Sequence, residues 1–171
     1  MKKLAVVVVL CLCLSACQTE GGSVADKVLA DFGLRDRPEG YVSGTDRVYA
    51  NLGAVGDTEM KRLNLGERHG ELKFQQDGLR GTYYKEVKVY ENFYPLDATP
   101  ASRSGQDNAQ EYYGYVEYAF RVYQSERFAT RAEAEAAMAT IRTDVEGREV
   151  YRYNFTSGGN WDGGKGSRTK R

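Results

Sequence analysis

The sequence predicts an α+β fold: a mainly antiparallel sheet with an N-terminal helix and one helix before the last strand, packed on one face. Three observations lead to this prediction. Thr82–Tyr94 and Tyr112–Gln124 alternate apolar and polar side chains, as half-buried strands do. A capping box at Thr130 and Glu133 opens an alanine-rich helix that runs to about residue 141. The stretch Glu149–Thr156 then alternates again, with aromatic rings on one side.

The weaker elements are placed by the residues that begin, end or interrupt them. Ser23–Leu34 is predicted as a helix, because Ser23 can cap it and its apolar residues share one side. Arg35–Gly70 is expected to be a loop with short helical or extended pieces, because glycines interrupt every candidate element. Glu71–Gln75 is a short strand candidate, and Gln76-Asp77-Gly78 forms a turn into the next strand. The helix between the last two strands could make that one pair parallel.

Composition excludes some classes of function. The 171 residues include 24 basic and 24 acidic side chains, and this zero net charge argues against a nucleic-acid-binding protein. An apolar fraction of 41% with 28% charged residues is typical of a globular domain. The glycines from Gly159 to Gly166 resemble a phosphate-binding loop only superficially, since Gly166 replaces the Ser or Thr and no helix follows. We therefore expect no cofactor.

The N-terminus has the organisation of an export signal. Lys2 and Lys3 precede Leu4–Leu14, an apolar stretch of 11 residues. A membrane-spanning helix needs roughly 20 residues, whereas a signal-peptide core has about this length. The stretch ends in Leu14-Ser15-Ala16-Cys17, which resembles the lipobox of bacterial lipoprotein precursors. The alternative is a plain secretory signal, cleaved near the same place, which would leave Cys17 as a free thiol.

The resemblance implies that Cys17 carries the lipid (palmitate among its acyl chains) and that residues 1–16 are removed. It then divides the chain into a signal peptide (1–16), a lipidated tether (17–22), a single α+β domain (23–156) and a glycine-rich, basic, flexible tail (157–171). Cys11 and Cys13 leave with the signal, so the domain is expected to hold no disulfide and no cysteine metal site. By the same resemblance, Gln18 favours the outer membrane, facing the periplasm, in a Gram-negative cell.

The sequence gives little support for a catalytic site. The one histidine, His69, could share a face with Glu67 and Glu71 on an extended backbone and bind a metal, but flanking glycines favour a turn that would separate them. A serine triad would have to use His69, and no nucleophile-elbow motif is present. A two-carboxylate hydrolase of envelope polysaccharide remains an alternative, and its candidate carboxylates lie on or beside strands: Glu86, Glu91, Glu111 and Glu117.

Tyrosine is the distinctive residue of this chain. There are 13, and eleven lie between Tyr83 and Tyr153. Tyrosine and arginine recur at interface hot spots, although tyrosine is also an ordinary strand residue. The candidate binding residues, which would share the solvated sheet face or lie in the tail, are Tyr90, Tyr115, Arg121, Tyr123, Arg152 and Trp161.

These observations together predict a membrane-anchored envelope lipoprotein and favour a non-enzymatic role over an enzymatic one. Its leading role is a binding or assembly-support module that presents the tyrosine-bearing face to an envelope protein or glycan. The alternatives are the polysaccharide hydrolase and an inhibitor of a secreted enzyme. The inhibitor would use the polar segment Leu96–Gln110 as its reactive loop.

Overall fold

The computed structural model describes residues 41–78, 80–101 and 111–170. Contacts divide the chain into two units, Met1–Ser43 and Gly44–Arg171, and the fold given below is that of the second. The predicted signal, Cys17, the tether and the predicted helix Ser23–Leu34 lie outside the described residues. None of the described helices is both long and apolar enough to span a membrane.

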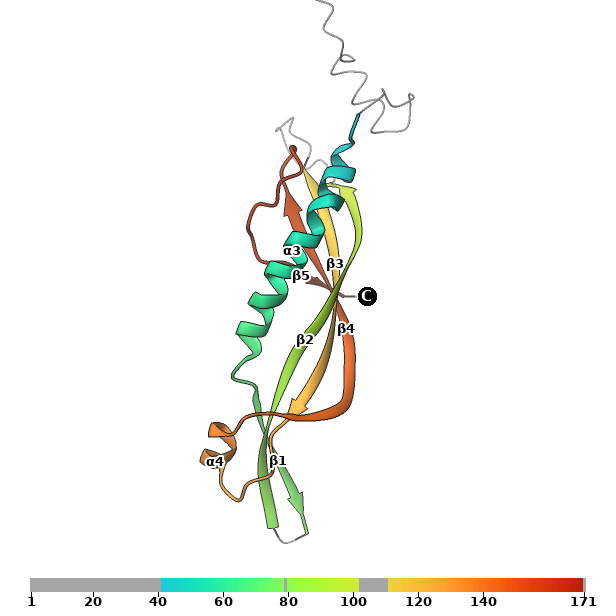
Figure 1. Ribbon diagram of the computed structural model, residues 1–171. Coiled ribbons are helices and arrows are strands. Elements are labelled where there is room, and N and C mark those ends of the chain that lie inside the picture. Colours follow the sequence, from blue (N-terminus) through green and yellow to red (C-terminus); the bar gives the residue numbers. More distant parts are fainter. Residues whose placement is uncertain (1–40, 79, 102–110, 171) are drawn as a thin grey trace, which may run out of the picture. The chain divides into compact units, whose positions relative to one another are not determined.

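Five strands form one sheet, in which every neighbouring pair is antiparallel (Figure 1). Their order across the sheet is their order along the chain: β1 (Glu71–Asp77), β2 (Arg80–Pro100), β3 (Tyr112–Gln124), β4 (Ile141–Phe155) and β5 (Ser167–Thr169). The predicted α+β class is confirmed. Helix α4 (Arg131–Ala136) lies between β3 and β4, and these strands are antiparallel, so the parallel alternative is wrong.

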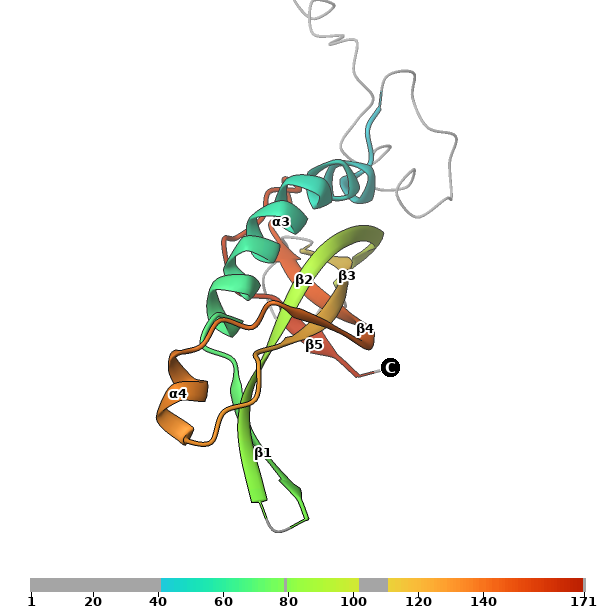
Figure 2. The ribbon, with the colours of Figure 1, turned by 60° about the horizontal axis from the view of Figure 1, so that its bottom comes forward.

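Helix α3 (Gly44–Glu67) packs along one face of the sheet (Figure 2), where the sequence predicted a loop over Arg35–Gly70. That prediction is wrong for the described part of the segment. Three apolar residues recur at helical spacing and are buried: Val48, Leu52 and Val55. Each internal glycine costs the helix about 1 kcal/mol relative to alanine. Packing against the sheet therefore supplies stability that helix propensity alone does not.

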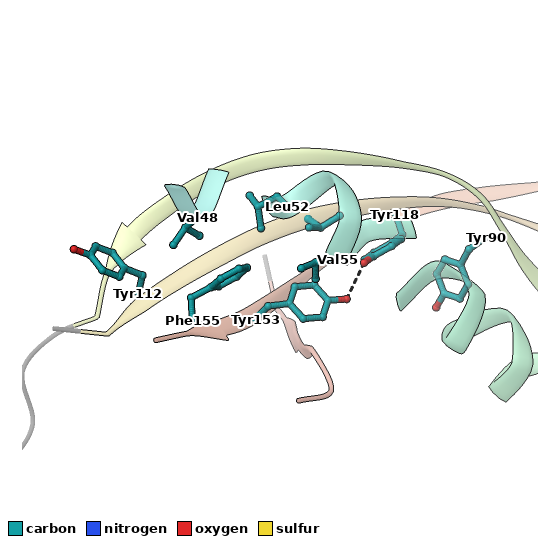
Figure 3. Close-up of a cluster of buried hydrophobic side chains, with 9 residues drawn as sticks. Val48, Leu52, Val55, Tyr90, Tyr112, Tyr118, Tyr153 and Phe155 are labelled. Carbon is teal, nitrogen blue, oxygen red and sulfur yellow. Dashed lines mark hydrogen bonds between the residues drawn. The ribbon is translucent and has the colours of Figure 1, made fainter. Parts of the chain in front are cut away.

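The core lies between α3 and the sheet (Figure 3). Its helix side is aliphatic, whereas its sheet side combines Val116 with five aromatic residues: Tyr90, Tyr112, Tyr118, Tyr153 and Phe155. The hydroxyls of Tyr118 and Tyr153 lie 2.8 Å apart in a hydrogen bond. This bond lets two large rings be buried without leaving their polar ends unpaired.

Tyr90 belongs to this core, with 3% of its surface exposed, and not to the solvated face on which we expected it. The register of β2 against β3 shifts between Tyr90 and Asn92, so one extra residue is inserted at Glu91. Tyr90 pairs with Phe120 and, beyond the bulge, Phe93 pairs with Tyr118, so both rings face α3. An uninterrupted alternation would have placed them on opposite faces.

Two other boundaries differ from the sequence prediction. The capping box at Thr130 is present, but α4 ends at Ala136, and β4 begins at Ile141, where we predicted the helix to continue. Gln124 pairs with Ile141, so ladder hydrogen bonds replace helical ones there. Strand β2 runs to Pro100, so the first part of the predicted loop Leu96–Gln110 is strand, and residues 102–110 lie outside the described part.

The C-terminal segment is built into the sheet, in contrast to the flexible tail that the sequence predicted. Ser167–Thr169 forms β5 against β4. Trp161 forms an isolated antiparallel β-bridge with Phe155. The indole of Trp161 meets the ring of Tyr153 edge-on, with centroids 6.3 Å apart. Aromatic contact and strand pairing thus offset the entropy cost of ordering a glycine-rich chain.

Substitution of two glycines in the middle of α3 tests how this helix packs against the sheet. A Cβ on Gly56 would lie 2.3 Å from Cδ2 of Phe93, whereas one on Gly53 would meet nothing within 4 Å. We expect Gly56→Ala to lower the free energy of unfolding by about 1–3 kcal/mol. The matched control Gly53→Ala should raise it by about 0.5–1 kcal/mol. Urea unfolding measures both, and changes of the same sign would contradict this packing.

Candidate binding face

The sheet has two unlike faces. Along β3 the even-numbered side chains from Tyr112 to Val122 lie on the side of α3, and the odd-numbered ones lie on the other side. Helix α4 lies near the β1 end (Figure 1). Strand pairing brings tyrosines and arginines onto the side away from α3, among them Tyr94, Tyr113, Tyr115, Arg121, Tyr123, Arg142, Arg148 and Arg152. We call this surface the arginine–tyrosine face.

Arg121 is fixed at one part of this face by two carboxylates. Its Nη2 donates to Glu146 at 2.6 Å, and its Nε lies 3.7 Å from a carboxylate oxygen of Glu91. The phenol of Tyr123 donates to Glu91 at 2.7 Å, and this hydrogen bond raises the pKa of Tyr123. Only 16% of the Arg121 side chain is exposed, so it is held in place and partly withdrawn from solvent.

Arg148 joins a carboxylate and a ring at the middle of the face. Its Nη1 donates to Glu117 at 2.8 Å, and its guanidinium carbon lies 5.7 Å from the ring centre of Tyr94. Such a cation–π contact contributes about 0.5–1 kcal/mol at an exposed site. Tyr94 itself is 45% exposed, so its ring is available to a partner.

Arg152 has a different environment. Its guanidinium carbon lies 4.5 Å from the ring centre of Tyr113, and Tyr115 is its cross-strand neighbour. Within the described ranges it forms no ion pair, and its Nε is buried without a hydrogen-bond partner. A buried donor left unsatisfied costs about 1–3 kcal/mol. This cost makes Arg152 the least satisfied cation of the face.

A cleft of about 730 Å³ opens at the edge of the face, where β5 ends beside β4. Three cationic and two acidic residues line it together with two uncharged ones: Arg148, Arg168, Lys170, Glu117, Glu149, Val150 and Thr169. Its size suits a peptide segment or a small ligand. The cleft is larger than three other pockets among the described residues, which measure about 340, 260 and 220 Å³.

Glu149 anchors the inner wall of this cleft. Its carboxylate accepts hydrogen bonds from Lys88 at 2.9 Å, Tyr90 at 2.8 Å and Tyr151 at 3.1 Å. Arg168 of β5 lies 3.1 Å away. Burial would raise the pKa of Glu149, but these hydrogen bonds and the charge of Lys88 outweigh it and hold that pKa below its ordinary value of 4.5. The ionised carboxylate thus holds β5 against the sheet.

The structure brings four of the six predicted binding residues together. Tyr115, Arg121, Tyr123 and Arg152 all lie on the arginine–tyrosine face. Tyr90 lies in the core on the opposite side. Trp161 packs against Tyr153 on the side of α3 and is also apart from the face.

Sequence reasoning missed four of the named members of the face. Tyr113 shares the parity of Tyr115 along β3 and could have been found by continuing that alternation. Tyr94 reaches the face only because of the bulge at Glu91. Arg142 and Arg148 belong to a part of β4 that the sequence did not identify as strand.

The candidate catalytic residues are dispersed. Glu86 pairs with Gln124 on the side of α3, whereas Glu117 lies on the opposite face and is bound to Arg148. His69 lies in the turn between α3 and β1, where Gly70 has a φ of +63°, so the predicted turn is present. Within the described residues, no group of three or more histidine, cysteine, aspartate or glutamate side chains is placed to hold a metal ion.

The charge of Glu149 makes the free energy of unfolding depend on pH. A carboxyl whose pKa is lower in the folded state stabilises the fold above its unfolded pKa and stops doing so as the pH falls through the folded value. We expect the free energy of unfolding to decrease below about pH 4.5 and Glu149→Gln to flatten this decrease. Urea unfolding between pH 7 and pH 3 measures it. Glu135→Gln, at an exposed site, is the control, and an equal flattening there would refute the role of Glu149.

Comparison of the chain with protein-family models, with curated proteins and with solved structures found no match. The function of the arginine–tyrosine face therefore has to be inferred from its own geometry and charges.

Proposed function

We propose that this protein is a lipid-anchored component of the cell envelope that binds another envelope component through its arginine–tyrosine face. The role is non-enzymatic, as a binding or assembly-support module. The basic, apolar and lipobox-like segments that end at Cys17 support the anchor. In a Gram-negative cell, Gln18 supports the outer membrane, with the domain facing the periplasm.

This proposal rests on one observation. Three arginine side chains are fixed by neighbouring residues on the face that α3 leaves uncovered. Arg121 is fixed by carboxylates, Arg152 by a ring and Arg148 by both. Side chains that are already ordered lose little entropy when a partner binds. Tyrosine and arginine are also the residues most enriched at binding hot spots. The face thus combines suitable chemistry with preorganisation.

The alternative functions have less support. A polysaccharide hydrolase needs a proton donor and a second carboxylate that flank the scissile bond, about 5–10 Å apart, within one substrate cleft. Glu86 and Glu117 lie on opposite faces, and the pKa of Glu149 is lowered, whereas a donor needs a raised one. The inhibitor hypothesis needs a reactive loop, but Leu96–Pro100 belongs to β2.

The anchor can be tested by replacing the lipidated cysteine. We expect Cys17→Ala to move the protein from the membrane fraction to the soluble fraction, because acyl chains hold it to the bilayer. Cys13→Ala is the matched control, since this cysteine leaves with the signal, and it should fractionate as the wild type. Mass spectrometry of the N-terminal peptide checks for the acyl groups. A Cys17→Ala protein that stays with membranes after an alkaline wash would rule out the lipid anchor.

The face can be tested with Tyr94, whose ring is exposed, and Tyr123, whose ring is partly exposed. We expect Tyr94→Ala with Tyr123→Ala to abolish co-purification of the envelope partner after crosslinking in cells. The free energy of unfolding should fall by less than about 1 kcal/mol, because neither ring belongs to the core. Tyr49→Ala is the control, since Tyr49 is 52% exposed on α3, away from the face. Equal losses of partner from the two proteins would contradict binding through the face.

A further inference from the structure

Among the described residues, the one charge that lines the cleft at the end of β5 without an ion pair is positive. Its two carboxylates are already occupied, because Glu117 binds Arg148 at 2.8 Å and Glu149 lies 3.1 Å from Arg168. Lys170 also lines the cleft, and it forms no ion pair with any described residue. The cleft therefore offers cationic donors to a ligand but no free carboxylate.

Arg152 extends this positive region onto the arginine–tyrosine face. Val150 lines the cleft, and Arg152 follows two residues later on the same side of β4, about 7 Å along the strand. Its guanidinium is stacked on Tyr113, has no ion pair among the described residues and keeps a buried Nε unsatisfied. A guanidinium that is held by a ring but has no ion pair can donate two parallel hydrogen bonds to the carboxylate of a ligand.

We propose that the cleft and Arg152 together bind an acidic, extended segment of a partner protein. This inference rests on the proposed function and adds the chemistry of the partner. One glutamate or aspartate side chain of the segment pairs with Arg152, and a second pairs with Lys170. The rings of Tyr113 and Tyr115 flank the first of these contacts.

The edge of β4 favours a peptide over an anionic glycan. Strand β5 pairs with only Val150, Tyr151 and Arg152, so within the described residues the outer edge of β4 from Ile141 to Glu149 has no strand beside it. Backbone N–H and C=O groups at such an edge can pair with an added extended peptide. A peptide in the cleft lies next to this edge and continues the line of β5. A polysaccharide lacks the backbone amides that would complete this ladder.

Fluorescence anisotropy with a defined probe tests the inference. The probe is a fluorescein-labelled octapeptide of alternating valine and glutamate, with a valine–glutamine octapeptide as its uncharged counterpart. We expect the acidic peptide to bind the wild-type protein and Arg152→Gln to weaken binding about tenfold or more, because a charge-assisted pair is lost. Arg152→Lys should remain weaker than wild type, because lysine cannot form the bidentate pair. Arg131→Gln, the same charge change at an exposed site on α4, should bind within about twofold of wild type.

Each other result would overturn the inference. Binding by Arg152→Gln within about twofold of wild type, or an equal loss in Arg131→Gln, would show that no specific site exists. Equal binding of the glutamine peptide would exclude carboxylate recognition. Oligogalacturonate that competes as well as the peptide at equal carboxylate concentration would indicate a glycan ligand. Thermal unfolding of Arg152→Gln and Arg152→Lys separates lost binding from lost folding. If the peptide inference fails while partner capture still depends on Tyr94 and Tyr123, the proposed function stands.

Discussion

The packing of one helix against one face of the sheet is the constraint on which the rest of the structure depends. Helix α3 brings Val48, Leu52 and Val55 down onto an aromatic layer, and Phe93 lies so close to Gly56 that the helix admits no side chain there. Helix α3 leaves the opposite face uncovered. Its rings and charges are stabilised by one another, through stacking on arginine and through ion pairs. The arginine–tyrosine face is thus a consequence of where α3 packs.

The bulge at Glu91 connects the two sides of the sheet. It directs Tyr90 inward, where its hydroxyl donates to Glu149 at 2.8 Å, and this carboxylate also lies 3.1 Å from Arg168 of β5. The bulged residue itself accepts from Tyr123 and lies near Arg121 on the outer face. One inserted residue therefore contributes to the attachment of the C-terminal strand and to the organisation of the binding face.

The sequence allowed the fold class and most of the sheet to be predicted, because the alternation in β3 is unbroken and its neighbours follow it. It also allowed the capping box of α4 to be predicted, since this motif is local. Helix α3 was missed, because its glycines and low propensity are compensated only by contacts with distant strands. Tyr90 was assigned to the wrong face because a bulge leaves no clear signal in the alternation. Arg148 and the docked Trp161 depend on pairings that no local pattern encodes.

The measurement that tests the central claim most directly is site-specific photocrosslinking in living cells at two exposed tyrosines on opposite sides of the sheet. A photoreactive residue replaces Tyr94 on the arginine–tyrosine face in one protein and Tyr49 on α3 in the other, and the adducts are identified by mass spectrometry. The account predicts one discrete protein adduct from position 94, with an acidic segment at the crosslink, and none from position 49. The same adducts from both positions, or adducts from position 49 alone, would contradict it.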